Sequence, residues 1–287
     1  MYNEAITKNL FRGCAALSLA GMLCSCGSGE KEAAQALYSQ AQSLYDSKQY
    51  NESIVLLDSL KKNYTGDIDL LKKGLHLRTL NQEGQILAEM AQNDSLISAL
   101  ETEFKKLSGN FKYIKHPDMV EGFYIHNSIA GETEKTNRVA IEPRIDESDM
   151  FYIVSYLTGH DVKHTSIKLA NENGASVTSA TVPYDEAQNY RYKSGGTSYE
   201  IVTFSNSQCD TLGYFTAANE GSAIKVTFQG NKAYSMQLNK KHVKAIAETY
   251  RHATNKTQGK AAIQKRMFLQ QKLELAKKQI EQTKITE

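Results

Sequence analysis

The sequence predicts an α+β protein in which a helical hairpin and long coiled-coil-like helices flank an antiparallel β-sandwich. Two observations support this fold class. Apolar residues recur at helical spacing up to Leu107, with no proline between Glu32 and Leu107, and they do so again after Asn239. Between Asn110 and Asn239 the apolar period falls to two, which is typical of strands with one buried face.

The first residues of the chain divide as a secretory signal does. Lys8 and Arg12 precede an apolar run of about ten residues that ends at Leu23, too short for a bilayer core that needs about 20. Cleavage before Cys26 leaves the small Ser25 at the cut, whereas cleavage two residues earlier would leave the bulky Leu23 there. The sequence therefore predicts a signal peptide over residues 1–25.

The tetrapeptide Leu23-Cys24-Ser25-Cys26 resembles the lipobox of bacterial lipoproteins. The resemblance implies a lipidated Cys26 that anchors the chain to a membrane, with residues 26–33 as a short flexible tether. No aspartate follows Cys26, which favours the outer membrane over the inner one. Glu30 and Glu32 are similar to the acidic export signal of Bacteroidetes lipoproteins, but the periplasmic and surface-exposed alternatives both stay open.

Cysteine usage and charge limit how the mature chain is stabilised and what it binds. Cys209 is the one cysteine left after the signal is removed and Cys26 is lipidated, so no intramolecular disulfide can form. From Asn239 onward the chain has 12 Lys and Arg against 4 Glu, although its formal net charge is only +2. This pattern predicts a basic tail on an acidic body, and nucleic acid would lie outside the compartment.

Residues 34–108 are predicted to be helical, beginning with a hairpin. A polar break over residues 46–49 separates two faces, one formed by Leu37, Ala41 and Leu44, the other by Tyr50, Ser53, Leu57 and Leu60. At this spacing the residues resemble one tetratricopeptide repeat. A single repeat cannot bury its own face, so the resemblance implies packing on another part of the chain or on a partner.

Two rows of apolar residues at heptad spacing enclose the β-rich region. The first row consists of Ile86, Met90, Ile97, Leu100, Phe104 and Leu107, with the polar Asn93 in its middle slot. The second row consists of Ala262, Leu269, Leu273, Ala276 and Ile280, with Arg266 in the remaining slot. We expect the basic C-terminal helix over residues 240–287 to pair in an antiparallel manner with residues 67–107. Separate packing of the two helices remains the alternative.

The sandwich domain is predicted over residues 110–239, with about eight short strands. A hairpin with a two-residue turn at Gly230 and Asn231 is the clearest local signal. The predicted strands cover residues 122–127, 138–145, 150–157, 166–170, 199–204, 212–216, 224–229 and 234–238.

Two groups of residues are candidates for binding. His160 and His164 have the spacing of zinc ligands on a helix, but Gly159 favours an exposed hairpin turn, so a metal site there is the weaker interpretation. Tyr184, Tyr190, Tyr192 and Tyr199 surround Gly195 and Gly196, and such rings either cover the core or bind a sugar or a protein partner. We expect Tyr190 and Tyr192 to lie in a loop.

The chain contains no nucleophile elbow, phosphate loop, dinucleotide fingerprint or Cys-x-x-Cys pair, so no cofactor is expected. The sequence favours a non-enzymatic envelope lipoprotein that acts as a protein-interaction or envelope-assembly module. The alternative is a glycan-binding lipoprotein that uses the tyrosines of the sandwich. A third, weaker hypothesis is a metal-dependent hydrolase that uses His160 and His164.

Overall fold

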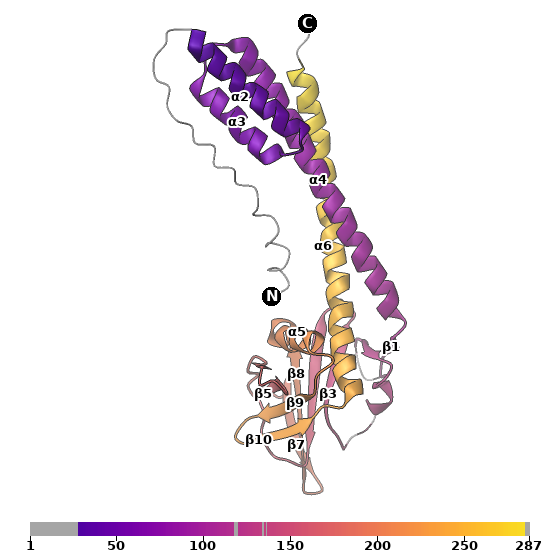
Figure 1. The fold of residues 1–287 in the computed structure, drawn as a ribbon. Coiled ribbons are helices and arrows are strands. Elements are labelled where there is room, and N and C mark those ends of the chain that lie inside the picture. The colour runs from indigo at the N-terminus through magenta and orange to yellow at the C-terminus, as the bar shows by residue number, and fades with distance from the viewer. Residues whose placement is uncertain (1–27, 118–119, 134, 136, 285–287) are drawn as a thin grey trace. The chain divides into compact units, whose positions relative to one another are not determined.

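The computed structural model describes residues 28–284 except residues 118–119, 134 and 136 (Figure 1). The chain divides into two compact units. One comprises Met1–Leu87 with Leu273–Glu287, and the other comprises Ala88–Lys272. The predicted signal peptide and the predicted lipidation site, Cys26, lie outside the described residues.

The first unit is helical. It contains α2 (Ser28–Asp46), α3 (Tyr50–Asn63), the start of α4 (Ile68–Ser108) and the end of α6 (Lys240–Thr283). The Ser53 hydroxyl donates a hydrogen bond to the Ala41 carbonyl oxygen at 2.7 Å, so the two small residues let α2 and α3 approach closely. One cluster of buried apolar residues in this unit consists of Ala34, Ala41, Leu57, Leu60, Leu70 and Leu77.

Residues 28–33 were expected in the flexible tether, but α2 already begins at Ser28. The segment is rich in Glu, Lys and Ala, which are strong helix formers, and Ala34 is buried against the rest of the hairpin. Helix propensity and this contact therefore extend the helix into the part that the sequence assigned to a linker.

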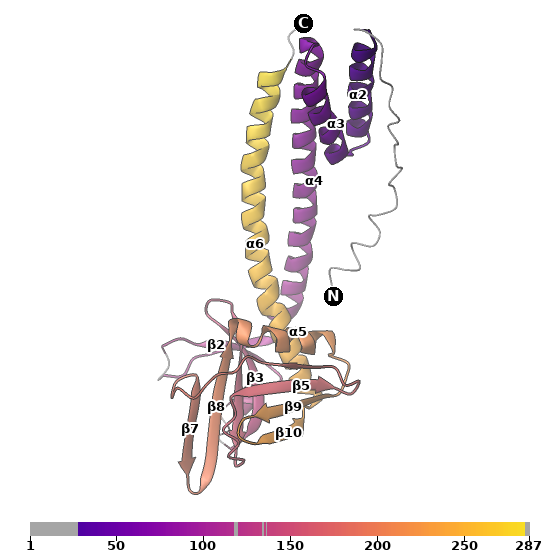
Figure 2. The same cartoon turned by 90° about the vertical axis from the view of Figure 1, so that its left-hand side faces the viewer.

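The second unit contains two antiparallel sheets, and the predicted α+β class with helices flanking the sheets is confirmed (Figure 2). The six-stranded sheet has the order β1 (Phe111–Ile114), β2 (Phe123–His126), β3 (Val139–Asp146), β4 (Phe151–Thr158), β8 (Thr197–Ser205) and β7 (Asn189–Ser194). The four-stranded sheet has the order β10 (Ala233–Gln237), β9 (Ile224–Gln229), β5 (Ser166–Asn171) and β6 (Ser176–Thr178). Three short helices complete the unit: η1 (Ala130–Glu132), η2 (Asn206–Gln208) and α5 (Asp210–Ala218).

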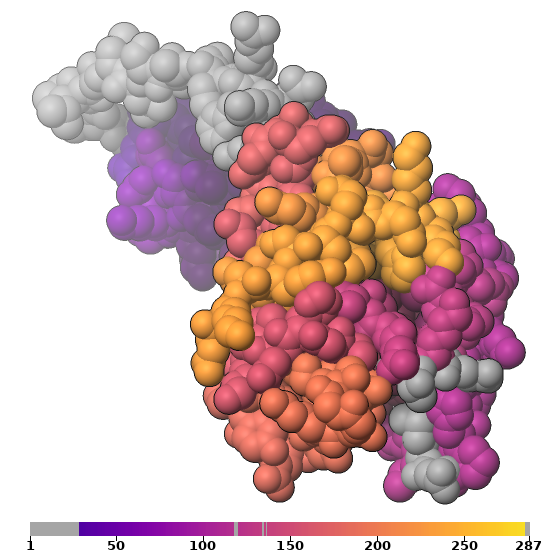
Figure 3. Space-filling model, turned by 90° about the horizontal axis from the view of Figure 1, so that it is seen from below, coloured from indigo at the N-terminus to yellow at the C-terminus, as the bar shows by residue number. Residues whose placement is uncertain are grey.

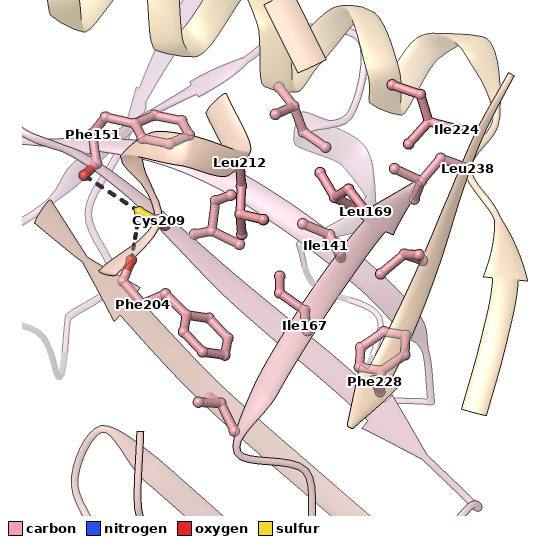
Figure 4. Close-up of a cluster of buried hydrophobic side chains, with 14 of the residues drawn as sticks. Ile141, Phe151, Ile167, Leu169, Phe204, Cys209, Leu212, Ile224, Phe228 and Leu238 are labelled. Carbon is pink, nitrogen blue, oxygen red and sulfur yellow. Dashed lines mark hydrogen bonds between the residues drawn. The ribbon is translucent and has the colours of Figure 1, made fainter. Parts of the chain in front are cut away.

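The two sheets enclose one apolar core (Figure 4). Side chains along a strand alternate between its two faces, and this is clearest in β8, where every second side chain is buried. Each fully buried large aliphatic side chain contributes roughly 1.5–3 kcal/mol. Cys209 belongs to this core: its Sγ lies 3.1 Å from the Phe204 carbonyl oxygen, and burial raises the pKa of the thiol to about 12.

Two sequence predictions in this unit were wrong. Residues 212–216 form part of helix α5 instead of a strand, because a short apolar run fits either structure and Gly213 lets the Tyr250 ring pack closely against the helix. The β9–β10 connection has three residues instead of two, since Ala233 pairs with Gln229.

Strands β1, β6 and β7 were not predicted, so the described residues of this unit form ten strands in place of about eight. The omission of β7 matters most, because it holds Tyr190 and Tyr192 in a strand at the sheet edge instead of a loop. Figure 3 shows segments of different colours interleaved on one face, as expected when sheets join strands that are distant in sequence.

Within the second unit, part of α4 runs antiparallel to α6. The Asn93 side-chain amide donates to the Ala262 carbonyl oxygen at 2.9 Å, and Lys265 pairs with Glu89 at 2.8 Å. Arg266, in the heptad slot that lacks an apolar residue, is exposed. Towards its start, α6 leaves α4 and packs on the sandwich core through Val243, Ile246 and Ala253.

Candidate functional site

His160 and His164 lie in the same loop, but the structure does not bring their rings together. His160 is exposed and stacks on Tyr234, with ring centroids 3.6 Å apart. His164 is fully buried, so the expected exposed turn is wrong for this residue. Asp161 and Lys163 both have positive φ angles, of 43° and 56°, which turn the backbone between the two histidines.

His164 is the centre of a buried hydrogen-bonded series. Its Nδ1 lies 2.7 Å from Glu200 Oε2, and its Nε2 lies 2.7 Å from the Ser155 hydroxyl. Glu200 also accepts hydrogen bonds from the backbone N–H groups of Lys163 and His164, at 2.6 and 2.7 Å. Burial raises the pKa of Glu200, but these hydrogen bonds lower it more, so the net pKa is below the ordinary value.

The order serine, histidine, carboxylate is that of an acyl-transfer triad, but the burial differs. Ser155 and His164 are 0 % exposed and Glu200 is 2 % exposed, so a substrate cannot reach the serine oxygen in this conformation. The Glu200 carboxylate lies on strand β8, and its hydrogen bonds instead hold the loop that contains His164 against this strand. Among the described residues, no group of three or more His, Cys, Asp or Glu side chains could hold a metal ion.

Three of the four predicted tyrosines come together on the outer face of β7 and β8. Tyr192 and Tyr199 are cross-strand neighbours whose rings are 4.6 Å apart and nearly parallel, at 4°. Tyr190 lies 5.6 Å from Tyr192, and the Tyr199 hydroxyl donates to Asn137 Oδ1 at 2.8 Å. We call Tyr190, Tyr192 and Tyr199 the tyrosine face.

Tyr184 is not part of the tyrosine face. Its ring lies 5.0 Å from the guanidinium of Arg191, whose side chain points to the opposite side of β7 from Tyr190 and Tyr192. The Gly195-Gly196 turn joins β7 to β8 with φ angles of 56° and 81°, a conformation that favours glycine. This turn places Tyr192 directly opposite Tyr199.

A small cavity of about 190 Å³ lies beside the tyrosine face. Tyr192, Tyr199, Tyr156 and Arg138 contribute to its lining. The Arg138 guanidinium lies 3.6 Å from the centre of the Tyr156 ring and pairs with Glu142 at 2.8 Å. Its buried Nε has no hydrogen-bond partner within the described part of the chain.

Sequence reasoning missed Ser155, Glu200 and Arg138. Ser155 and Glu200 lie on strands whose partners are set by sheet pairing, and Arg138 directly precedes β3, so no local spacing connects them to the residues they contact. Tyr156 can be placed on the less buried face of β4 from the sequence, because it alternates with buried residues along the strand.

No helix among the described residues is both long enough and apolar enough to cross a membrane. Comparison with protein-family models, with curated proteins and with solved structures finds no match to this chain.

Proposed function

We propose that this chain is a lipid-anchored lipoprotein of the outer membrane that acts as a non-enzymatic interaction module for an envelope protein. The tyrosine face is the binding surface, and the observation that carries this assignment is the stacked Tyr192–Tyr199 pair beside Tyr190 on an edge strand. Aromatic residues that combine an apolar ring with a hydroxyl are enriched in protein interfaces.

Exposure and position support this role. Tyr190 is 44 % exposed and Tyr192 is 39 % exposed, although neither is needed to complete the sandwich core. The outer edge of β7 also presents backbone groups that an extended segment of a partner can pair with. The full burial of Ser155 supports a binding function over hydrolysis.

The membrane anchor rests on the lipobox resemblance and has a direct test. Cys26→Ala should abolish incorporation of labelled palmitate and release the protein into the soluble fraction. Labelling that persists and moves to Cys24 would contradict the assignment. The α2–α3 hairpin, with its tetratricopeptide-like spacing, would add a second contact surface near the anchor.

The binding surface can be tested with a matched pair of tyrosines. A photo-crosslinking residue at Tyr190 should capture an envelope protein, and capture should fall when Tyr192 is replaced by alanine. Tyr214 is the control, because it is 45 % exposed but lies on α5. Equal capture from positions 190 and 214 would contradict a specific tyrosine face, as would unfolding of the Tyr192→Ala variant.

A neutral glycan is a second candidate ligand, and the cavity beside the tyrosine face favours it. At about 190 Å³ it is smaller than drug-sized sites, which begin at roughly 300 Å³, so it suits a single sugar ring. Tyr199→Ala should then weaken binding on a glycan array at least tenfold, about 1.4 kcal/mol, whereas Tyr214→Ala should not.

A further inference from the structure

A groove runs along one side of the paired part of α4 and α6, away from the tyrosine face. Its wider part has a volume of about 390 Å³. It is lined by the apolar residues Ile97, Leu100, Phe104 and Ile263, with the charged residues Glu101, Lys105, Lys256 and Lys260 around them. A second part of about 200 Å³ shares Phe104 and Lys256 with the first, so the two lie next to each other. The lining of α4 extends from residue 97 to residue 108, about 16 Å of helix.

Gly259 keeps the wider part of the groove open. Glycine inside a helix is less favourable than alanine, so an interior glycine usually has a packing reason. Here a Cβ added at Gly259 would meet no described atom within 4 Å, and the residue lines the groove. A side chain at this position would therefore project into the space that the groove occupies.

The narrower part of the groove contains an unpaired histidine. His252 lies between Phe104 and Phe111, with ring centroids 4.7 and 4.6 Å away, and it is 9 % exposed. Its Nδ1 has no hydrogen-bond partner among the described residues, and neither has the buried Nδ2 of Asn255 in the wider part. Leaving a buried polar atom without a partner destabilises a fold, so both atoms favour a ligand that supplies one.

The charges at the junction of the two parts leave one cation in excess. Asp149 is 5 % exposed, and its two carboxylate oxygens pair with different lysines of α6, Oδ1 with Lys256 and Oδ2 with Lys260 at 2.6 Å. Two ammonium groups thus share one buried carboxylate. A ligand with a single negative charge would balance this group.

We propose that the groove binds a fatty acid, with its acyl chain along Ile97, Leu100 and Ile263 and its carboxylate at Lys256 and His252. An apolar helix face seated in the groove would leave the Nδ1 of His252 without a partner, which distinguishes the fatty acid from an amphipathic helix. This site is independent of the tyrosine face, so either proposal can fail alone.

Isothermal titration calorimetry with dodecanoate tests the proposal. The full chain should carry Cys26→Ala, so that no acyl chain attached to the protein competes. We expect one dodecanoate per chain, and at least tenfold weaker binding of dodecanol, which has the same apolar chain without the charge.

Three variants locate the site. Gly259→Leu should fill the groove and weaken dodecanoate binding at least tenfold while raising the free energy of unfolding, because leucine is the better helix former. Gly259→Ala is its matched control and should keep most of the affinity. His252→Phe preserves the aromatic stack, and Lys256→Gln leaves Lys260 to pair with Asp149, so each should reduce the preference for dodecanoate over dodecanol.

Absence of dodecanoate binding to the full chain would overturn the proposal, as would an affinity unchanged by Gly259→Leu. Sedimentation velocity tests whether a second copy of the chain occupies the groove instead of a fatty acid. A dimer that dissociates in the Gly259→Leu variant would assign the groove to a second copy of the chain and would likewise overturn the fatty-acid site.

Discussion

His164 and His252 belong to the same unit and are both buried, yet their hydrogen-bonding environments are opposite. Both ring nitrogens of His164 have partners, Glu200 and Ser155. His252 is 9 % exposed and its Nδ1 has no partner in the described part of the chain. The comparison separates a histidine that stabilises the fold from one whose polar atom is free for a ligand, since a protein rarely leaves a buried polar atom unpaired.

Replacing each histidine by phenylalanine should give the largest difference between the two positions, measured as the change in the free energy of unfolding. His164→Phe should lower the free energy of unfolding by about 3–5 kcal/mol, because Glu200 would keep a buried charge without its ring partner. His252→Phe should change it by less than about 1 kcal/mol, because the aromatic stack remains and an unpaired nitrogen is removed. Urea unfolding followed by circular dichroism measures both.

His160→Phe is the control for this pair, since His160 is exposed and stacks on Tyr234. Its unfolding free energy should stay within about 0.5 kcal/mol of the wild type. Similar losses in the His164 and His252 variants would remove the distinction between them.

Ser155→Ala should have an intermediate effect and tests whether the buried series is structural. The variant leaves the Nε2 of His164 unpaired in a fully buried position, which should cost about 1–2 kcal/mol. Ser176→Ala, at an exposed position of β6, is the matched control and should change stability by less than about 0.5 kcal/mol. A neutral or stabilising Ser155→Ala would fit a catalytic serine better, because active-site residues are commonly kept at a cost in stability.

The contrast between regions also explains which parts of the fold the sequence could predict. Strands such as β8 alternate strictly between buried and exposed residues, so their period is visible. Strand β7 has only Asn189 buried, and its Arg191 and Lys193 hide any alternation. Residues 212–216 fit either structure, and contact with Tyr250 of α6 decides for a helix.

The candidate sites were less predictable than the fold. Sequence spacing found the tyrosines around the Gly195-Gly196 turn, because a two-residue hairpin keeps them close. It could not find His252, whose surroundings come from Phe104 and Phe111, more than 140 positions away. The spacing of His160 and His164 was misleading, because two residues with positive φ between them direct the rings apart.

The smallest expected effect is on the pH dependence of stability, which tests the assignment of His252 as a buried histidine without a hydrogen-bond partner at Nδ1 among the described residues. Burial lowers the pKa of His252 below its ordinary value of 6.5; Lys256 lowers it further, whereas Asp149 raises it. Because the folded-state pKa is the lower one, neutral His252 stabilises the fold above pH 6.5, and this contribution is lost as the pH falls below that value. The wild type should therefore lose slightly more unfolding free energy than His252→Phe between about pH 7 and about pH 5.5 in urea titrations.

His242, whose pKa burial also lowers, is present in both proteins and cancels from the difference. Parallel pH profiles would mean that His252 binds its proton equally well in the folded and unfolded chains, which a buried ring next to a lysine should not do.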